Sequence, residues 1–167
     1  RPSSTQVPRR DLETRAIRSL DDIGFDDAAS VGVKAANIAT MRGFGFDDGV
    51  IPTGYAVPFA FYDGFMRHNG FDDAVREMLA DPSFQSDADV REAALARLRD
   101  AIEDGEMPEW MMDALARVHA EFPEGTNIRC RSSTNNEDLP GFSGAGLYDS
   151  FTHKTAEGHL SKSIKQV

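Results

Sequence analysis

The stretch that decides the fold is "NIRCRSSTNNEDLPGFSGAGLYDSF", residues 127–151. Apolar and basic residues alternate along residues 128–131, which places Arg129 and Arg131 on one face of a predicted strand and Ile128 on the other. The segment "LYDSFTH", residues 147–153, is expected to return as a second strand. The connection between the two is too long for a tight hairpin, and connections of that length inside compact domains tend to be functional. The pattern therefore predicts a pair of strands with a functional loop at one end.

Helical periodicity dominates the chain before this stretch. Residues 30–43 predict a short helix with Ser30 as its N-cap and Gly43 at its end. A short strand is predicted at "YAVP", residues 55–58, and three further helical stripes run through residues 71–121, with glycine and proline at their boundaries. We expect these stripes to bury against one another and against the strands. The fold class is therefore α+β, with helices packed on a small, mostly antiparallel sheet.

Composition limits the partners of the chain. The net charge of −10 argues against a general affinity for nucleic acid or for an anionic membrane, because both require a broad basic surface. No apolar run approaches the ~20 residues that span a bilayer. Cys130 is the one cysteine and has no partner for an internal disulfide, which indicates a thiol in a reducing compartment and a cytoplasmic location.

The domain organisation follows from length and from the two ends. A chain of 167 residues is long enough for one domain with a real core. Residues 1–19 read as an extended arm or linker, and residues 20–167 as the domain. The first residue is Arg1 instead of Met, and the last ten residues stop within a predicted helix, so we expect a piece of a longer protein.

Residues around the long loop predict a site for a phosphate group. The guanidinium of Arg131 is a planar fork of donors that matches phosphate oxygens, and Ser132 adds a hydroxyl. Loop glycines let backbone N–H groups approach an anion, because no Cβ blocks the way. Lys34 would supply a second charge near a helix N-terminus. The residues assigned to the phosphates are Lys34, Arg131, Ser132, Gly141, Gly144 and Gly146.

Each of these residues also has a plain structural interpretation. Alternating arginines are often the solvent face of a strand, and loop glycines often serve turns. Glu137 and Asp138 are candidate metal ligands or a candidate base, but "EDLP" is also an ordinary acidic turn, of a kind that caps a helix or pairs with an arginine such as Arg129. None of the four histidines shows the spacing of a zinc site. The pattern alone leaves the two interpretations open.

Two motifs together resemble one family. "VGVKAANIATM", residues 31–41, is followed about ninety residues later by "RCRSSTNNEDLPGFSGAG", residues 129–146. In this order and at this distance they resemble the N-terminal nucleotide-binding domain of phosphoenolpyruvate synthase and pyruvate phosphate dikinase. The resemblance implies the first lobe of an ATP-grasp-like domain, in which Lys34 and Arg131 contact the phosphates of ATP and the glycine segment covers them. It leaves Arg129 without a family role, as a residue behind the site.

The chain departs from the family pattern at three places. Val33 and Ala35 replace two glycines of the lysine motif, and "TNN", residues 134–136, replaces smaller residues. A side chain at position 33 or 35 would restrict the approach of the backbone to a phosphate. The resemblance covers the chain from about Leu20 onward, but only the first part of the nucleotide domain of the family. It implies that Mg²⁺ ligands lie outside this chain, which contains no catalytic residue and is inactive alone.

The leading functional hypothesis is an ATP-dependent phosphotransferase of this family. The whole enzyme would use ATP and Mg²⁺ to phosphorylate a histidine on another domain, and then pyruvate, giving phosphoenolpyruvate. One alternative is a dikinase with a glucan or an antibiotic as acceptor. Another is a regulatory module that keeps the fold and has lost ATP, which Val33 and Ala35 make worth testing. A purely structural role is the fourth hypothesis.

Overall fold

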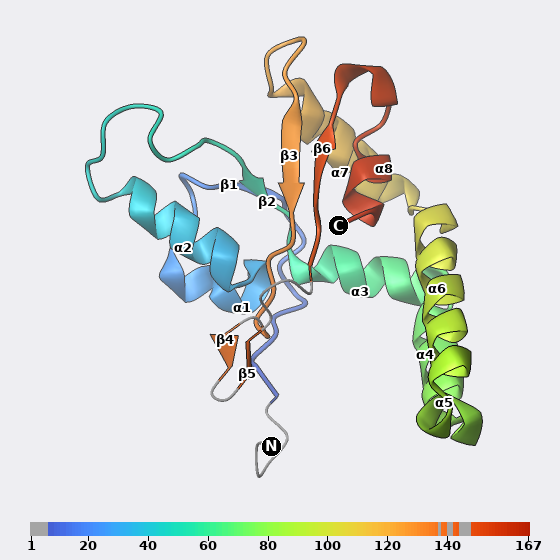
Figure 1. The fold of residues 1–167 in the computed structure, drawn as a ribbon. Coiled ribbons are helices and arrows are strands. Elements are labelled where there is room, and N and C mark those ends of the chain that lie inside the picture. Colours follow the sequence, from blue (N-terminus) through green and yellow to red (C-terminus); the bar gives the residue numbers. More distant parts are fainter. Residues whose placement is uncertain (1–6, 137, 140–141, 144–147) are drawn as a thin grey trace.

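The computed structural model describes residues 7–136, 138–139, 142–143 and 148–167 (Figure 1). The α-helices are α1 (Ala28–Val31), α2 (Val33–Arg42), α3 (Phe59–His68), α4 (Phe71–Ala80), α5 (Pro82–Ser86), α6 (Ala88–Asp104), α7 (Glu109–Ala120) and α8 (Ser161–Lys165). The 3₁₀ turns are η1 (Phe25–Asp27) and η2 (Thr155–Glu157). The strands are β1 (Arg18–Ser19), β2 (Tyr55–Ala56), β3 (Ile128–Arg131), β4 (Asp138–Leu139), β5 (Phe142–Ser143) and β6 (Ser150–His153). The predicted α+β class is confirmed.

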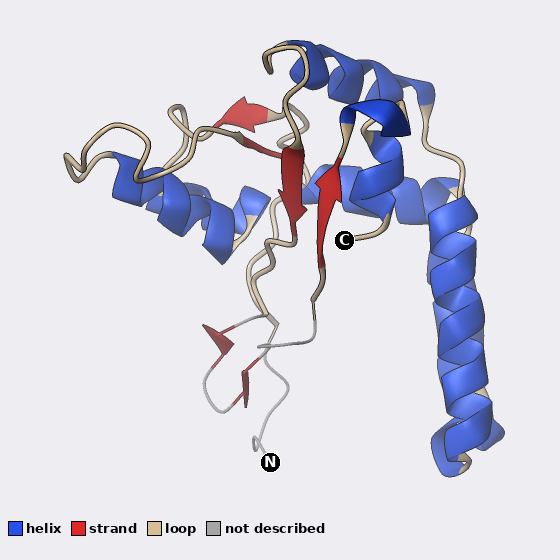
Figure 2. Cartoon of the chain, turned by 45° about the horizontal axis from the view of Figure 1, so that its top comes forward, coloured by secondary structure: helices blue, strands red, loops and turns tan. Residues whose placement is uncertain are grey.

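All strand pairs among the described residues are antiparallel. β3 pairs with β6, the predicted returning strand, and in this register Ile128 lies opposite His153 and Arg131 opposite Ser150. β1 pairs with β2, and β4 with β5 inside the long connection. The strands thus form three separate two-stranded pairs instead of one small sheet (Figure 2).

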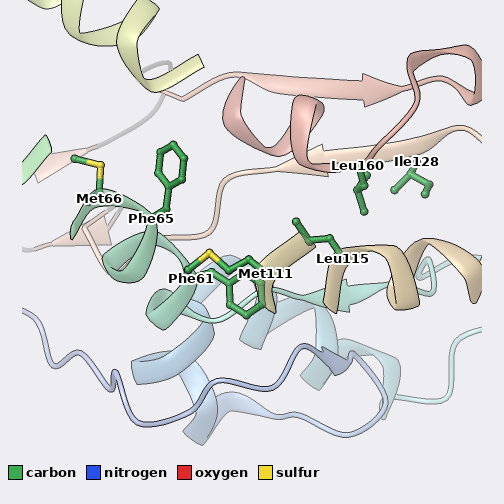
Figure 3. Packing of buried hydrophobic residues seen from close by; sticks show 7 residues of the cluster. All are labelled: Phe61, Phe65, Met66, Met111, Leu115, Ile128 and Leu160. Atoms are coloured by element: carbon green, nitrogen blue, oxygen red, sulfur yellow. The ribbon is translucent and has the colours of Figure 1, made fainter. Parts of the chain in front are cut away.

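The larger hydrophobic core lies between β3, α3, α7 and the segment before α8 (Figure 3). Met111 and Leu115, one turn apart on α7, are completely buried there. Ile128 adds the apolar face of β3, and the half-buried Cys130 packs against the same cluster. Burial raises the pKa of the Cys130 thiol, which keeps it protonated. The predicted alternation of β3 is therefore correct, since its arginines are exposed on the other face.

A second cluster joins the β1–β2 pair to α1 and α2. Its buried residues are Leu20, Ile23, Val31, Ala36, Ala39 and Ala56. The small side chains of Ala36 and Ala39 on α2 allow this helix to lie close to its neighbours. The second cluster fixes the position of α2, which carries Lys34.

The helices α4, α5 and α6 project away from both clusters (Figures 1 and 2). Neither α4 nor α6 contains a fully buried residue, and Leu79 is 51% exposed. The three predicted helical stripes are confirmed as helices, but only the last of them, on α7, is buried in the core. Between α4 and α6 lies the additional helix α5, which Asp81 caps by accepting a hydrogen bond from the Ser83 N–H at 2.8 Å.

The start of the lysine-bearing helix differs from the prediction. Ser30 is not its N-cap but lies inside α1, where its hydroxyl donates to the carbonyl of Asp27 at 3.0 Å. Gly32, with a φ of +85°, interrupts the helix and itself caps α2. Gly43 ends α2 as predicted. The cause of the difference is a junction with a distant segment, which local sequence does not reveal.

Candidate phosphate-binding site

Gly32 is the point at which α2 meets the segment that leaves β3. A Cβ at this position would lie 2.4 Å from Ser133 Oγ and 2.5 Å from the Ser133 carbonyl carbon. Together with the positive φ, this contact requires glycine. The backbone of residue 133 therefore reaches the backbone of the helix start, and the two motifs, far apart in sequence, come together here.

Hydrogen bonds fix the junction on the helix side. The Val33 N–H donates to the Thr134 carbonyl at 3.1 Å, and the Ala35 N–H donates to Ser133 Oγ at 3.0 Å. These donors belong to the first turn of α2, where N–H groups lack partners within the helix. The segment after β3 thus caps the N-terminal end of α2. It occupies backbone N–H groups at the helix N-terminus, where an anion was expected from the sequence.

Lys34 reaches across the same junction. Its Nζ donates to the Ser132 carbonyl at 3.0 Å and lies 3.5 Å from Ser132 Oγ. The two residues are 98 positions apart in sequence. The ammonium group is therefore placed next to the residue that follows Arg131 in the sequence.

The two arginines of β3 lie on its exposed face. Arg129 Nη1 donates to Thr152 Oγ1 on the paired strand at 2.7 Å. Among the described residues, neither Arg129 nor Arg131 forms an ion pair, although the chain contains 28 acidic residues. A pair of exposed guanidinium groups that forms no ion pair with a carboxylate among the described residues is suited to bind an anion.

The remaining predicted residues lie on the long connection. Gly141, Gly144, Gly146 and Glu137 are outside the described residues. Asp138 lies in β4, where it is paired with Ser143. The structure thus brings Lys34 to Ser132 beside Arg131, and the roles of the loop residues stay predictions.

The departures at positions 33 and 35 fit the helix geometry. Both residues belong to α2, and no residue other than glycine has a positive φ in the part of the chain that the structure describes. A helical backbone at Val33 and Ala35 does not require glycine. The glycine that the junction does require, Gly32, is retained.

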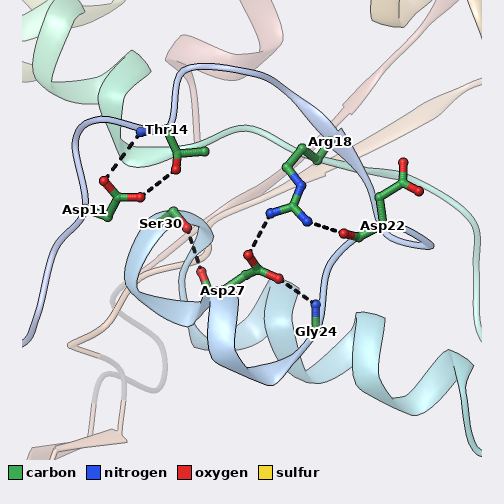
Figure 4. A network of polar contacts seen from close by, with 7 residues as sticks. All are labelled: Asp11, Thr14, Arg18, Asp22, Gly24, Asp27 and Ser30. Carbon is green, nitrogen blue, oxygen red and sulfur yellow. Dashed lines mark hydrogen bonds and ion pairs between the residues drawn. The ribbon is translucent and has the colours of Figure 1, made fainter.

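A polar network supports α1, the helix immediately before the junction (Figure 4). The Asp27 carboxylate accepts hydrogen bonds from the Gly24 N–H at 2.9 Å and from Arg18 Nη1 at 2.6 Å. The hydrogen bond from Gly24 and the charge of Arg18 lower the pKa of Asp27. The other end of the Arg18 guanidinium donates to the carbonyl of Asp22. Asp27 thereby joins β1 to the turn that precedes α1.

Sequence reasoning missed one set of contacts at the site. Asn135 Nδ2 donates to the Arg9 carbonyl at 2.6 Å, which links the site to the N-terminal segment 126 residues earlier. The residues "TNN", 134–136, mark this place as a departure from the family pattern. They do not show which segment an asparagine here would contact. The boundary between an arm at residues 1–19 and the domain stays a prediction, although β1 pairs with β2 across it.

Within residues 7–136, 138–139, 142–143 and 148–167, no group of three or more His, Cys, Asp or Glu side chains is arranged to hold a metal ion. A ligand set for Mg²⁺ is therefore not assigned to them. Among the same residues, no helix combines the length and the apolar character that crossing a membrane requires.

The chain is similar to one protein family and to several named proteins. Residues 28–167 match the family described as "Pyruvate phosphate dikinase, AMP/ATP-binding domain". The chain is 29% identical over 169 residues to a probable phosphoenolpyruvate synthase of Staphylothermus marinus, which covers 97% of the chain and 19% of that protein. It is 28% identical over 152 residues to a phosphoenolpyruvate synthase of Deinococcus radiodurans, covering 90% and 19%.

A relative with another printed name also matches. A rifampicin phosphotransferase of Streptomyces sviceus is 26% identical over 153 residues, which cover 91% of the chain and 17% of that protein. The chain thus spans about a fifth of the length of these curated relatives.

Proposed function

The chain belongs to the pyruvate phosphate dikinase AMP/ATP-binding domain family, and from this premise we propose that Lys34, Arg131 and Ser132 hold the phosphates of ATP. The glycines Gly141, Gly144 and Gly146 would cover those phosphates from the long connection. Lys34 supplies a compact charge and Arg131 a planar fork, a combination that suits a polyphosphate. The chain would be the first lobe of an ATP-grasp-like domain.

The observation that carries this proposal is the contact of Lys34 Nζ with Ser132, at 3.0 Å from its carbonyl oxygen. A lysine on the exposed side of a helix would point to solvent. This lysine instead crosses to a segment 98 residues away that also carries an arginine without an ion pair among the described residues. Phosphoryl transfer is catalysed mainly by positioning and by neutralising charge, and a lysine held against the segment that carries Arg131 suits an ATP site.

We propose that the whole protein is an ATP-dependent phosphotransferase of the dikinase type. Its ATP, together with Mg²⁺ bound by residues outside those described, would phosphorylate a histidine on a separate domain, and that phosphoryl group would pass to pyruvate. The names of the phosphoenolpyruvate synthases among the relatives support this acceptor. Because the chain spans about a fifth of those proteins, the transfer steps involve sequence beyond it.

The test is the turnover of ATP by the intact protein carrying Arg131→Ala. Loss of one charge-assisted contact costs ~1.5–3 kcal/mol, so ATP-dependent turnover should fall at least about tenfold. Arg97→Ala is the matched control, because Arg97 is exposed on the projecting helix α6. Near-normal kinetics of the Arg131 variant would refute its role at the phosphates.

A second acceptor is favoured by the match to a rifampicin phosphotransferase. The intact protein incubated with ATP and either pyruvate or rifampicin distinguishes the two, with ³¹P NMR reporting the phosphorylated product. Phosphoenolpyruvate as product supports the first proposal, and a phosphorylated antibiotic supports the second. If no heat of MgATP binding is measured, the chain is a regulatory module that has lost its nucleotide.

A further inference from the structure

We propose that residues 9–14 form a clasp that closes the two halves of the phosphate site on each other, and that Asn135 is the positioning residue that fastens it. The clasp is defined by its contacts to α1 on one side and to the segment after β3 on the other. The inference rests on the proposed function only in its effect on ATP binding, because the contacts that form the clasp do not involve ATP.

The first fastening is the amide of Asn135. Its Nδ2 donates to the Arg9 carbonyl at 2.6 Å, and its Oδ1 is shielded from solvent without a donor among the described residues. The hydrogen bond itself lies at the exposed surface, between the half-buried Asn135 and the exposed Arg9. Figures 1 and 2 both show the N-terminal segment running alongside the segment that leaves β3.

The second fastening is on α1. The Asp11 N–H donates to the Ala29 carbonyl at 2.7 Å. The Asp11 carboxylate also accepts a hydrogen bond from Thr14 Oγ1 at 2.6 Å (Figure 4). It accepts another from the Glu13 N–H at 2.8 Å, and the two bonds hold the segment in a turn. The hydrogen bonds from Thr14 and Glu13 lower the pKa of Asp11, so it accepts them as a carboxylate.

These contacts close a ring around the site. α1 continues through Gly32 into α2, the first turn of α2 binds residues 133–134, Asn135 binds Arg9, and Asp11 returns to α1. In such a ring each contact limits the movement of the others, because opening one requires its neighbours to rearrange. The clasp should therefore keep Lys34 against Ser132 before any ligand arrives, which lowers the cost of ordering the site on binding.

The clasp also accounts for the "TNN" departure. Thr134 contributes its carbonyl to α2, and Asn135 contributes its amide to the N-terminal segment, so adjacent residues face the two partners. A small residue at position 135 would lack the donor. The asparagine and the N-terminal segment thus form a matched pair within this chain.

Amide hydrogen exchange measured by NMR on the whole chain, without nucleotide, tests the clasp with Asn135→Asp. A carboxylate of the same shape cannot donate to the Arg9 carbonyl. Exchange at the Asp11, Val33 and Ala35 amides should accelerate about three- to tenfold, the range of one lost hydrogen bond. The control Asn136→Asp makes the same charge change one residue away, at an exposed side chain.

Further variants keep the result decisive. Arg9→Ala retains the accepting carbonyl and should leave exchange unchanged. The amides of α6 report whether each variant is folded. If Asn135→Asp unfolds the chain, deletion of residues 1–9 removes the same bond from the other side and should give the same acceleration. Exchange at Val33 and Ala35 that equals wild type in the folded variant, or in the deletion, would overturn the clasp.

Titration of the intact protein with MgATP separates the clasp from the proposed function. Weaker ATP binding by Asn135→Asp, about three- to tenfold, with kcat unchanged, supports a positioning role. Unchanged affinity despite faster exchange would overturn the link between clasp and site. If wild type itself binds no MgATP, the proposed function fails, while the exchange data still decide whether the clasp exists.

Discussion

The junction of α2 with the segment after β3 and the projecting helices α4 to α6 are built in opposite ways. The junction depends on contacts between residues 98 positions apart and on one glycine that cannot bear a side chain. The projecting helices depend on local caps, such as Asp87, whose carboxylate accepts hydrogen bonds from the Asp89 N–H at 2.9 Å and the Val90 N–H at 3.2 Å. Substitutions in the first region should therefore weaken ligand binding, whereas substitutions in the second region should affect only stability.

The largest effect is expected from Gly32→Ala. The new Cβ would meet Ser133 at 2.4 Å in a backbone conformation with a φ of +85°, so either the junction opens or the chain is strained. We expect a loss of about 3 kcal/mol or more in the free energy of unfolding, measured by chemical denaturation.

Alanine substitutions at two other glycines separate backbone strain from steric contact as causes of this loss of stability. At Gly45, with a φ of +74°, no atom lies within 4 Å of an added Cβ, so Gly45→Ala measures backbone strain alone. At Gly24, which has neither feature, an alanine should be nearly neutral. If Gly32→Ala costs no more than Gly45→Ala, the close approach at the junction is wrong.

A smaller effect is expected from Asp87→Ala at the start of α6. Loss of the N-cap costs about 1 kcal/mol of stability, because two N–H groups of the first turn lose their acceptor. Asp87→Asn retains an accepting oxygen and should keep most of the stability in thermal unfolding. The affinity for MgATP should be the same in both variants, and a change in affinity would contradict the independence of the two regions.

The smallest effect concerns Asp27 beside the junction, and it appears only in acid. Its pKa in the folded chain is lowered from 3.8, so it contributes stability that is present above pH 3.8 and is lost as the pH falls through the lowered value. In thermal unfolding between about pH 6 and about pH 2.5, Asp27→Asn should therefore give a shallower decline than wild type. Asp26→Asn, at an exposed neighbour, should keep the wild-type slope. Equal slopes for wild type and Asp27→Asn would argue against this linkage.

Local patterns in the sequence predicted most of the elements. The alternation of residues 128–131 predicted β3 and its exposed arginines, and the helical stripes predicted α6 and α7. Local patterns failed where tertiary contact decides the outcome, as at Ser30, which lies inside α1 because Gly32 interrupts the helix to meet Ser133.

The candidate residues of the site could be named from the sequence, but their arrangement could not. A lysine in a first turn and an arginine at a strand end can be read from the residues, and the order of two motifs pointed to their family. Lys34 reaches Ser132 because the second hydrophobic cluster positions α2, and no short motif encodes that packing. The contact of Asn135 with Arg9 joins residues 126 positions apart and was equally out of reach.

The most direct test of the central claim is isothermal titration of the intact protein with MgATP, comparing wild type, Lys34→Ala and Lys162→Ala. Lys34 lies at the junction, whereas Lys162 is exposed on α8. Loss of one charge-assisted contact to a phosphate should weaken binding by Lys34→Ala at least about tenfold, with Lys162→Ala equal to wild type. Equal affinity of all three proteins for MgATP would contradict the claim that this junction holds the phosphates.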